Sequence, residues 1–129
     1  LMRSKNVNST QKPSTVTHRH RVSNPICGDR VECVLNVSNQ KVVDAWIEVK
    51  GCALCKASAS LLADNLIGSS TDQVSVRAAN FLGEVERILN GYSSESEASL
   101  FDALPSAPAR RECVVLPWRC IQVALTQSE

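Results

Sequence analysis

The chain has 129 residues, 43% of them hydrophobic, and its 14 basic side chains are nearly balanced by 13 acidic ones. This length suits one domain with its own core, and the balanced charge gives no support for a protein that binds nucleic acid or an anionic membrane. No apolar run reaches the roughly 18 residues that span a bilayer, and the N-terminus lacks the apolar segment of a secretory signal. We therefore expect a cytoplasmic protein.

The first part of the chain, residues 1–24, is rich in Ser, Asn, Thr, Lys and Arg and has scarcely any apolar periodicity. Such a segment buries too little surface to offset the entropy lost on ordering. We predict a flexible polar and basic arm at residues 1–24 and a single domain at residues 25–129. The basic run His18–Arg21 could contact an acidic partner or supply a metal ligand, but a solvated stretch or short edge strand is the more frequent fate of such runs.

Two segments of alternating polarity then predict a β-hairpin. Residues 30–37 and 42–50 place apolar side chains at every second position, as half-buried strands do. The polar residues 38–41 form the turn between them. The inward faces are predicted to carry Val31, Cys33, Leu35 and Val37 in the first strand and Val43, Ala45, Ile47 and Val49 in the second.

Two helices are expected after the hairpin. Residues 53–67 are rich in Ala and Leu without Pro or Gly, which predicts a helix that stops at Gly68. Residues 72–90 repeat apolar side chains with helical spacing and are followed by Gly91, a typical helix terminator. The fold class that these elements indicate is α+β.

The remaining chain contains a lobe and a last helix. Residues 92–109 hold several Ser and Pro residues, which predicts a connecting lobe with one or two helical turns. Residues 111–126 predict a helix, but Pro117 lies inside this segment. Because proline is best tolerated in the first helical turn, we expect the regular helix to start near Leu116 or to bend there.

The six cysteines of this chain are expected to be reduced, because disulfide frameworks belong to short secreted chains with little core. Cys27 and Asp29 flank Gly28, which can take positive φ and let both side chains point at one centre. Cys52 and Cys113 are each expected near a helix start, where backbone N–H groups lower the pKa of a thiol. Nearby Arg110 and Arg111 add positive charge beside Cys113.

Each of these residues has a plainer interpretation. Cysteine in a cytosolic core is usually an inert buried thiol, and we accept this for Cys33 and Cys120. Cys55 is a packing residue of the first helical turn or a spare exchange thiol. Asp29 alone would close a turn, and Glu112 could raise the pKa of the adjacent Cys113 or add a carboxylate ligand. Three thiols with one carboxylate nevertheless favour a site for a soft metal or sulfur, with the carboxylate as the replaceable ligand.

Three ordered motifs of this chain resemble those of the SufU/IscU/NifU-like iron-sulfur cluster assembly scaffold family. The resemblance covers about residues 24–127. The intervals of 25 residues from Cys27 to Cys52 and of 61 residues from Cys52 to Cys113 resemble the SufU branch. The motifs are Asn24-Pro25-x-Cys27-Gly28-Asp29, then Gly51-Cys52 with Ala57-Ser58-x-Ser60, then Arg110-x-x-Cys113-x-x-Leu116-Pro117-Trp118.

The resemblance implies a small antiparallel three-stranded sheet packed against helices, with Cys27, Asp29, Cys52 and Cys113 meeting at one end. It implies that these four residues hold zinc or a transient [2Fe-2S] cluster. Cys52 or Cys113 would accept persulfide sulfur from a cysteine desulfurase, and recipient apo-iron-sulfur proteins would be the other partners. The alternatives are a zinc-dependent sulfurtransferase without a stable cluster and a non-catalytic structural zinc module, so whether the protein is an enzyme stays open.

Overall fold

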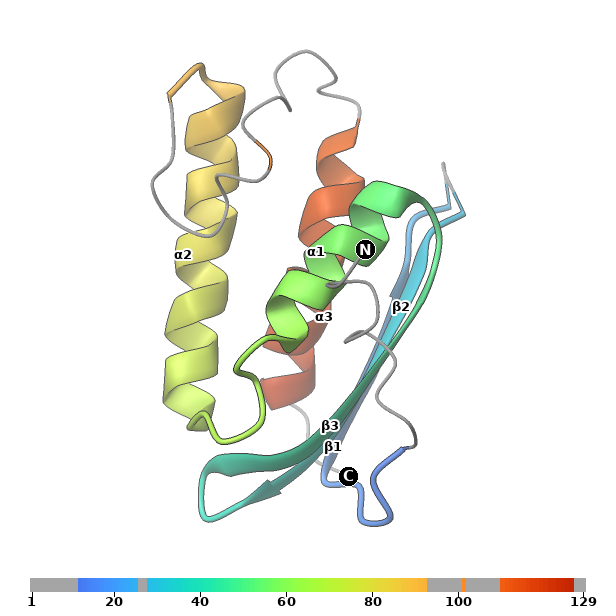
Figure 1. The fold of residues 1–129 in the computed structure, drawn as a ribbon, viewed down its shortest axis with the longest axis vertical. Helices are drawn as coiled ribbons and strands as arrows, with labels where there is room; N and C mark the ends of the chain where they lie inside the picture. The colour runs from blue at the N-terminus through green and yellow to red at the C-terminus, as the bar shows by residue number, and fades with distance from the viewer. Residues whose placement is uncertain (1–11, 26–27, 93–100, 102–109, 127–129) are drawn as a thin grey trace.

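In the part of the chain that the structure describes, three antiparallel strands in the order β1-β2-β3 form one sheet, and three helices pack with it (Figure 1). The computed structural model describes residues 12–25, 28–92, 101 and 110–126. The α+β class with a three-stranded antiparallel sheet is thus confirmed. The elements are β1 (His18–Ser23), β2 (Arg30–Ser38), β3 (Lys41–Lys50), α1 (Ala53–Ala63), α2 (Thr71–Leu89) and α3 (Arg111–Thr126).

The predicted hairpin is formed by β2 and β3. Asn39 and Gln40 occupy its turn with φ of 51° and 62°, the left-handed pair that a two-residue hairpin requires. The predicted inward position of Val43 is wrong, because its side chain is 48% exposed while Val42 is buried. The pairing register shifts between Asn36 and Val37 of β2. Asn36 pairs with Asp44 and Val37 pairs with Val42, and a bulge of this kind exchanges the faces of the residues beyond it.

The strand β1 corrects the predicted arm. Its residues from His18 to Ser23 pair with β2 in antiparallel register. The basic run His18–Arg21 is therefore part of an edge strand. Upstream of β1, Pro13 is buried and the Lys12 ammonium lies 4.6 Å from the centroid of the Trp46 ring. Composition did not reveal this strand because Val22 is its only apolar side chain against the core, and backbone pairing with β2 holds the rest in the sheet.

The helices pack in two layers on one face of the sheet. In Figure 1, α1 and α3 lie against the strands and α2 lies on their far side. Helix α3 contacts β1 and β2, α1 contacts β3, and α2 contacts α3. The Phe81 ring of α2 stacks on the Trp118 ring of α3 at a centroid distance of 4.1 Å, and Phe101 meets Phe81 edge-on at 6.1 Å. No helix in the described ranges is both long and apolar enough to cross a membrane.

The helix α1 ends earlier than predicted. It stops at Ala63 instead of continuing to Gly68, because Asp64 is extended and Asn65 takes a left-handed φ of 62°. Asparagine tolerates this conformation better than most residues. Helix α2 follows its predicted span closely, and Ser70 and Gln73 form a capping box at its start.

The helix α3 has the predicted span, Arg111–Thr126. It runs as one element from Arg111, so the prediction that the regular helix starts near Leu116 is wrong. Pro117 lacks an N–H and removes one backbone hydrogen bond from the helix. Burial of the turns on both sides of the proline overrides this loss: the residues from Cys113 to Trp118 are all buried. The predicted lobe at residues 92–109 lies outside the described residues, apart from the buried Phe101 and the exposed Tyr92.

Candidate metal centre

Asp29 stands at the entrance to β2. The chain turns sharply before it: the Gly28 N–H donates to the Asn24 carbonyl at 2.8 Å, and the Asn24 N–H donates to the Asp29 carbonyl at 2.8 Å. Gly28 takes a φ of +78°, as its place between two functional residues predicted. The Asp29 side chain is only 1% exposed. A buried carboxylate needs hydrogen-bond donors or a cation to offset its desolvation, so Asp29 is more than a surface turn residue.

Cys52 occupies the cap position that precedes α1, where it follows β3 through Gly51. Its backbone N–H donates to Oδ1 of Asp29 at 3.0 Å, and its Sγ lies 3.7 Å from Oδ2 of the same carboxylate. The side chain of Cys52 makes no capping hydrogen bond to the helix. The thiol is partly exposed and thus available to a reactant from solution.

Cys113 lies in the first turn of α3 and is only 2% exposed. The predicted low pKa of this thiol is wrong for the metal-free protein. Burial raises the pKa of Cys113 most, and hydrogen bonds with Asp29 and Cys52 raise it further. Arg111 does not offset these effects, because it pairs with Glu86 of α2. Cys113 therefore keeps its proton in the absence of a metal, and a metal ion that bound its sulfur would have to displace that proton.

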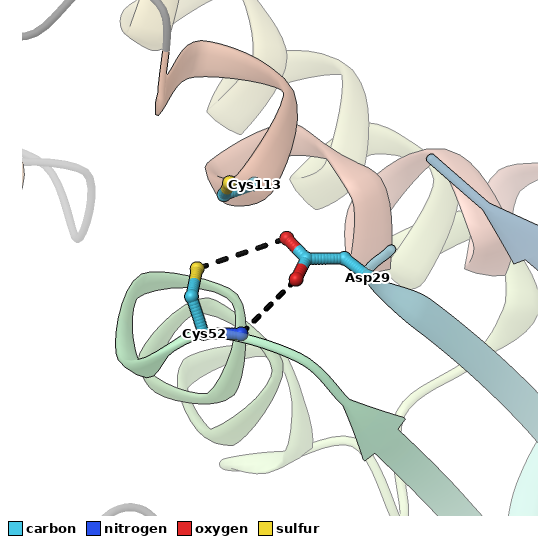
Figure 2. Close-up of side chains that lie close together, drawn as sticks. All are labelled: Asp29, Cys52 and Cys113. Carbon is cyan, nitrogen blue, oxygen red and sulfur yellow. Dashed lines mark hydrogen bonds between the residues drawn. The ribbon is translucent and has the colours of Figure 1, made fainter. Parts of the chain in front are cut away.

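Figure 2 shows Asp29, Cys52 and Cys113 converging from β2, α1 and α3. One ligand atom from each lies within 4.8 Å of those of the other two. Two sulfurs and one carboxylate oxygen suit zinc or iron and leave a tetrahedral site one ligand short. Cys27, the predicted fourth member, lies outside the described residues, next to the ordered turn at Gly28.

The other residues proposed from sequence lie apart from this trio. Glu112 pairs with Arg119 at 2.8 Å and is not among the three clustered ligand atoms in the described part of the chain. Cys33 and Cys120 are completely buried, which confirms their assignment to the core, and the complete burial of Cys55 favours its interpretation as a packing residue. All the described cysteines are free thiols. The sequence did not reveal the contact of the Cys52 N–H with Asp29; the unpaired donor at a helix start was its only signal.

Comparison with known proteins now identifies the family. The family model described as "NifU-like N terminal domain" matches residues 4–128. This chain belongs to that family. The family resemblance of its three motifs is thereby confirmed, and the match extends through every described element of the fold.

Characterised relatives of this NifU-like domain carry two names. The chain is 29% identical over 103 residues to the iron-sulfur cluster assembly scaffold protein IscU of Thermotoga maritima, which covers 77% of this chain and 70% of the relative. It is 25% identical over 111 residues to the zinc-dependent sulfurtransferase SufU of Bacillus subtilis. This alignment covers 84% of this chain and 74% of the relative. The relatives thus include one named as a scaffold and one named as a zinc-dependent enzyme.

Solved structures share the fold. The N-terminal part of a NifU-like protein from Brucella abortus superposes with a TM-score of 0.78 at 24% identity, covering 98% of this chain and 88% of that one. The SUF-system protein FiSufU from Fervidobacterium islandicum AW-1 gives a TM-score of 0.74 at 24% identity, covering 94% and 88%. At this identity the likeness extends to the fold alone.

Proposed function

We propose that this protein is an iron-sulfur cluster assembly scaffold and sulfur acceptor. Cys27, Asp29, Cys52 and Cys113 would hold zinc or a transient [2Fe-2S] cluster. The observation that supports this proposal most strongly is the convergence of two thiols and a buried carboxylate within 4.8 Å, in a chain of the NifU-like family. Thiolates retain iron or zinc firmly, whereas a single carboxylate is the harder ligand and the easier one to replace.

The sulfur would come from a cysteine desulfurase that carries it as a persulfide. We assign its acceptance to Cys52, since this thiol is partly exposed and Cys113 is only 2% exposed. The Cys52 thiolate attacks the terminal sulfur of the persulfide, a new S–S bond forms on Cys52, and the S–S bond of the donor breaks. The desulfurase cysteine leaves as a thiolate and takes up the proton that Cys52 released, so the transfer involves no net oxidation.

Metal content and visible absorbance test the scaffold proposal. The protein is purified as isolated and after anaerobic incubation with ferrous iron and sulfide. A scaffold acquires iron, sulfide and a visible chromophore, and Cys52→Ser loses them while Cys33→Ser, altered at a buried core thiol, keeps them. Stable zinc without any chromophore would reject the scaffold and favour the zinc-dependent sulfurtransferase, the activity named for the Bacillus subtilis relative.

A structural zinc module is the competing proposal from a different class. In such a module the metal only holds the elements together, so loss of a ligand lowers stability. Asp29→Ala separates the two proposals. In a transfer site the variant keeps its fold and changes the rate of sulfur or cluster exchange, whereas unchanged exchange with a large loss of thermal stability would favour the structural module.

A further inference from the structure

The two oxygens of the Asp29 carboxylate have different partners. Oδ1 accepts the backbone N–H of Cys52, while Oδ2 lies beside the Cys52 sulfur (Figure 2). Oδ1 already uses one lone pair on a backbone N–H, so Oδ2, which faces the Cys52 sulfur, is the less encumbered oxygen for a metal held by that sulfur. The geometry therefore separates a fixed oxygen from a ligand oxygen within one side chain.

Gly51 provides the space that this arrangement needs. A Cβ built on Gly51 would lie 2.7 Å from Cγ and 3.1 Å from Cβ of Asp29, and closer still to Oδ1. Real Cβ atoms essentially never come within 3.0 Å of another heavy atom, so one of the two residues would have to move. The φ of Gly51 is not in the positive region, so the residue serves here through its missing side chain rather than its backbone freedom.

Asp29 has little room to yield. Its side chain is 1% exposed, and its backbone carbonyl accepts a hydrogen bond within the turn before β2. The neighbours of Gly51 in the chain limit its movement, because it joins β3 to the cap residue of α1. A methyl group at position 51 would thus push the carboxylate away from the Cys52 N–H and out of line with the two thiols.

We propose that Gly51 is a positioning residue of the metal site. It lets the backbone at the start of α1 hold Oδ1 of Asp29, which leaves Oδ2 as a single oxygen ligand that an incoming sulfur can replace. When Oδ2 is replaced, Oδ1 remains on the Cys52 N–H, so the carboxylate stays in place to bind the metal again. This inference rests on the proposed function, since it assigns a role to Gly51 toward the metal that Asp29 would bind.

Zinc binding by a set of variants tests the proposal, with affinity measured by competition against a chromophoric chelator. Gly51→Ala is expected to weaken zinc binding about 10- to 100-fold, the usual effect of losing a residue that orients a ligand. Asp29→Ala weakens it as well. The variant that combines Gly51→Ala with Asp29→Ala should bind zinc no more weakly than Asp29→Ala alone, because Gly51 acts only through that carboxylate. Gly83→Ala is the matched control, since a Cβ there meets nothing within 4 Å.

The apo proteins provide a second measurement that needs no metal. Gly51→Ala is expected to unfold at a lower temperature than wild type, and adding Asp29→Ala should recover part of the loss by removing the clash. If Gly51→Ala alone does not fold, recovery of folding in the double variant carries the test. The cobalt-substituted spectrum of Gly51→Ala should resemble that of Asp29→Ala, because both lose the same oxygen ligand.

Two results would overturn the role of Gly51. The first is wild-type zinc affinity and an unchanged cobalt spectrum in Gly51→Ala. The second is a double variant that binds zinc much more weakly than Asp29→Ala, which would show that Gly51 acts independently of the carboxylate. Failure of the wild-type protein to bind either zinc or a cluster would instead reject the proposed function; recovery of apo stability in the double variant would then still support the contact.

Discussion

The hydroxyl of Ser58 shows how a single residue connects two helices beside the site. Its Oγ donates to the carbonyl of Val114 and accepts the indole N–H of Trp118 at 3.0 Å. These contacts join α1 to the part of α3 that contains Pro117. Ser60, two residues further along α1, is also buried, but its Oγ has no hydrogen-bond partner among the described residues. Ser58 therefore connects α1 to α3 by hydrogen bonds, whereas the Ser60 hydroxyl makes no such connection among the described residues.

Substitution of these serines gives a paired prediction. Ser58→Ala should lower the free energy of unfolding by about 1–3 kcal/mol, since it leaves the buried indole N–H of Trp118 without its acceptor. Ser60→Ala is the matched control and should change stability by less than about 1 kcal/mol, or raise it, because an unpaired buried hydroxyl is removed. Urea unfolding of the apo proteins measures both. Equal losses in the two variants would contradict the assigned hydrogen bonds.

The thiol of Cys33 makes the stability of the apo protein depend on pH. A hydrogen bond with Cys120 and burial raise the pKa of Cys33 well above its ordinary value. The unfolded chain loses this proton above about pH 8.5, whereas the folded protein keeps it, so stability falls as pH rises through this range.

Cys33→Ala should reduce this pH dependence. One thiol contributes a slope of about 1.4 kcal/mol per pH unit once the unfolded chain is ionised, and the variant should lack it. The measurement is urea unfolding between pH 8 and pH 10.5 in the presence of a phosphine reductant. The absolute stability of the variant falls because of the lost packing, so only the slopes are compared. Parallel curves for the two proteins would contradict the assignment.

At the scale of elements, the end of α1 depends on a residue of α2. The Arg77 guanidinium donates to the carbonyls of Leu61 and Leu62 at 2.6 and 3.0 Å and lies 5.0 Å from the centroid of the Trp118 ring. Carbonyls in the last turn of a helix have no partner within the helix, and a cation also interacts favourably with the helix dipole there. Arg77 thus links α1, α2 and α3.

Removing this guanidinium should destabilise the protein more than removing an exposed one. Arg77→Ala is expected to cost about 1.5–3 kcal/mol of unfolding free energy, the range for charged hydrogen bonds that are partly shielded from water. Arg87→Ala, on the same helix, removes a 58% exposed side chain paired with Glu84 and should cost less than about 0.5 kcal/mol. Thermal and urea unfolding of the two variants measure the difference. A larger loss in Arg87→Ala would contradict this role of Arg77.

The elements also show what sequence patterns can predict. Periodicity predicted the hairpin, α2 and the inward strand positions other than Val43, because those features follow from local spacing. The early end of α1 depends in part on hydrogen bonds from Arg77. The continuity of α3 depends on burial around Pro117, and the strand β1 depends on backbone pairing with β2. These causes are tertiary. Similarly, spacing indicated which thiols could meet, but the raised pKa of Cys113 follows from burial that no local pattern shows.

At the scale of the whole molecule, the fold has a core that does not involve a metal. Buried side chains from β2, β3 and all three helices form one hydrophobic cluster, with the stacked Phe81 and Trp118 rings among them. The trio of Asp29, Cys52 and Cys113 lies where β2, α1 and α3 begin. The proposed metal would therefore bind to a fold that its own packing maintains.

Metal removal should lower the melting temperature without unfolding the protein. A ligand bound only by the folded state stabilises it by mass action, by about 2.7 kcal/mol at a hundredfold excess over its Kd. After treatment with a chelator, the far-UV circular dichroism spectrum at room temperature should be unchanged and the melting transition should remain cooperative. Collapse of the helical signal on chelation would instead indicate a structural metal, as in zinc fingers.

The proposed role of Cys52 is to accept sulfur in a metal site shared with Asp29 and Cys113. The most direct measurement incubates the protein with a cysteine desulfurase and free cysteine, and then follows the intact mass and the desulfurase turnover. The proposal predicts a gain of one sulfur atom that maps to the Cys52 peptide, faster turnover, and loss of both effects in Cys52→Ser but not in Cys33→Ser. No added sulfur and no faster turnover, in a wild-type protein that is folded and metal-loaded, would contradict it.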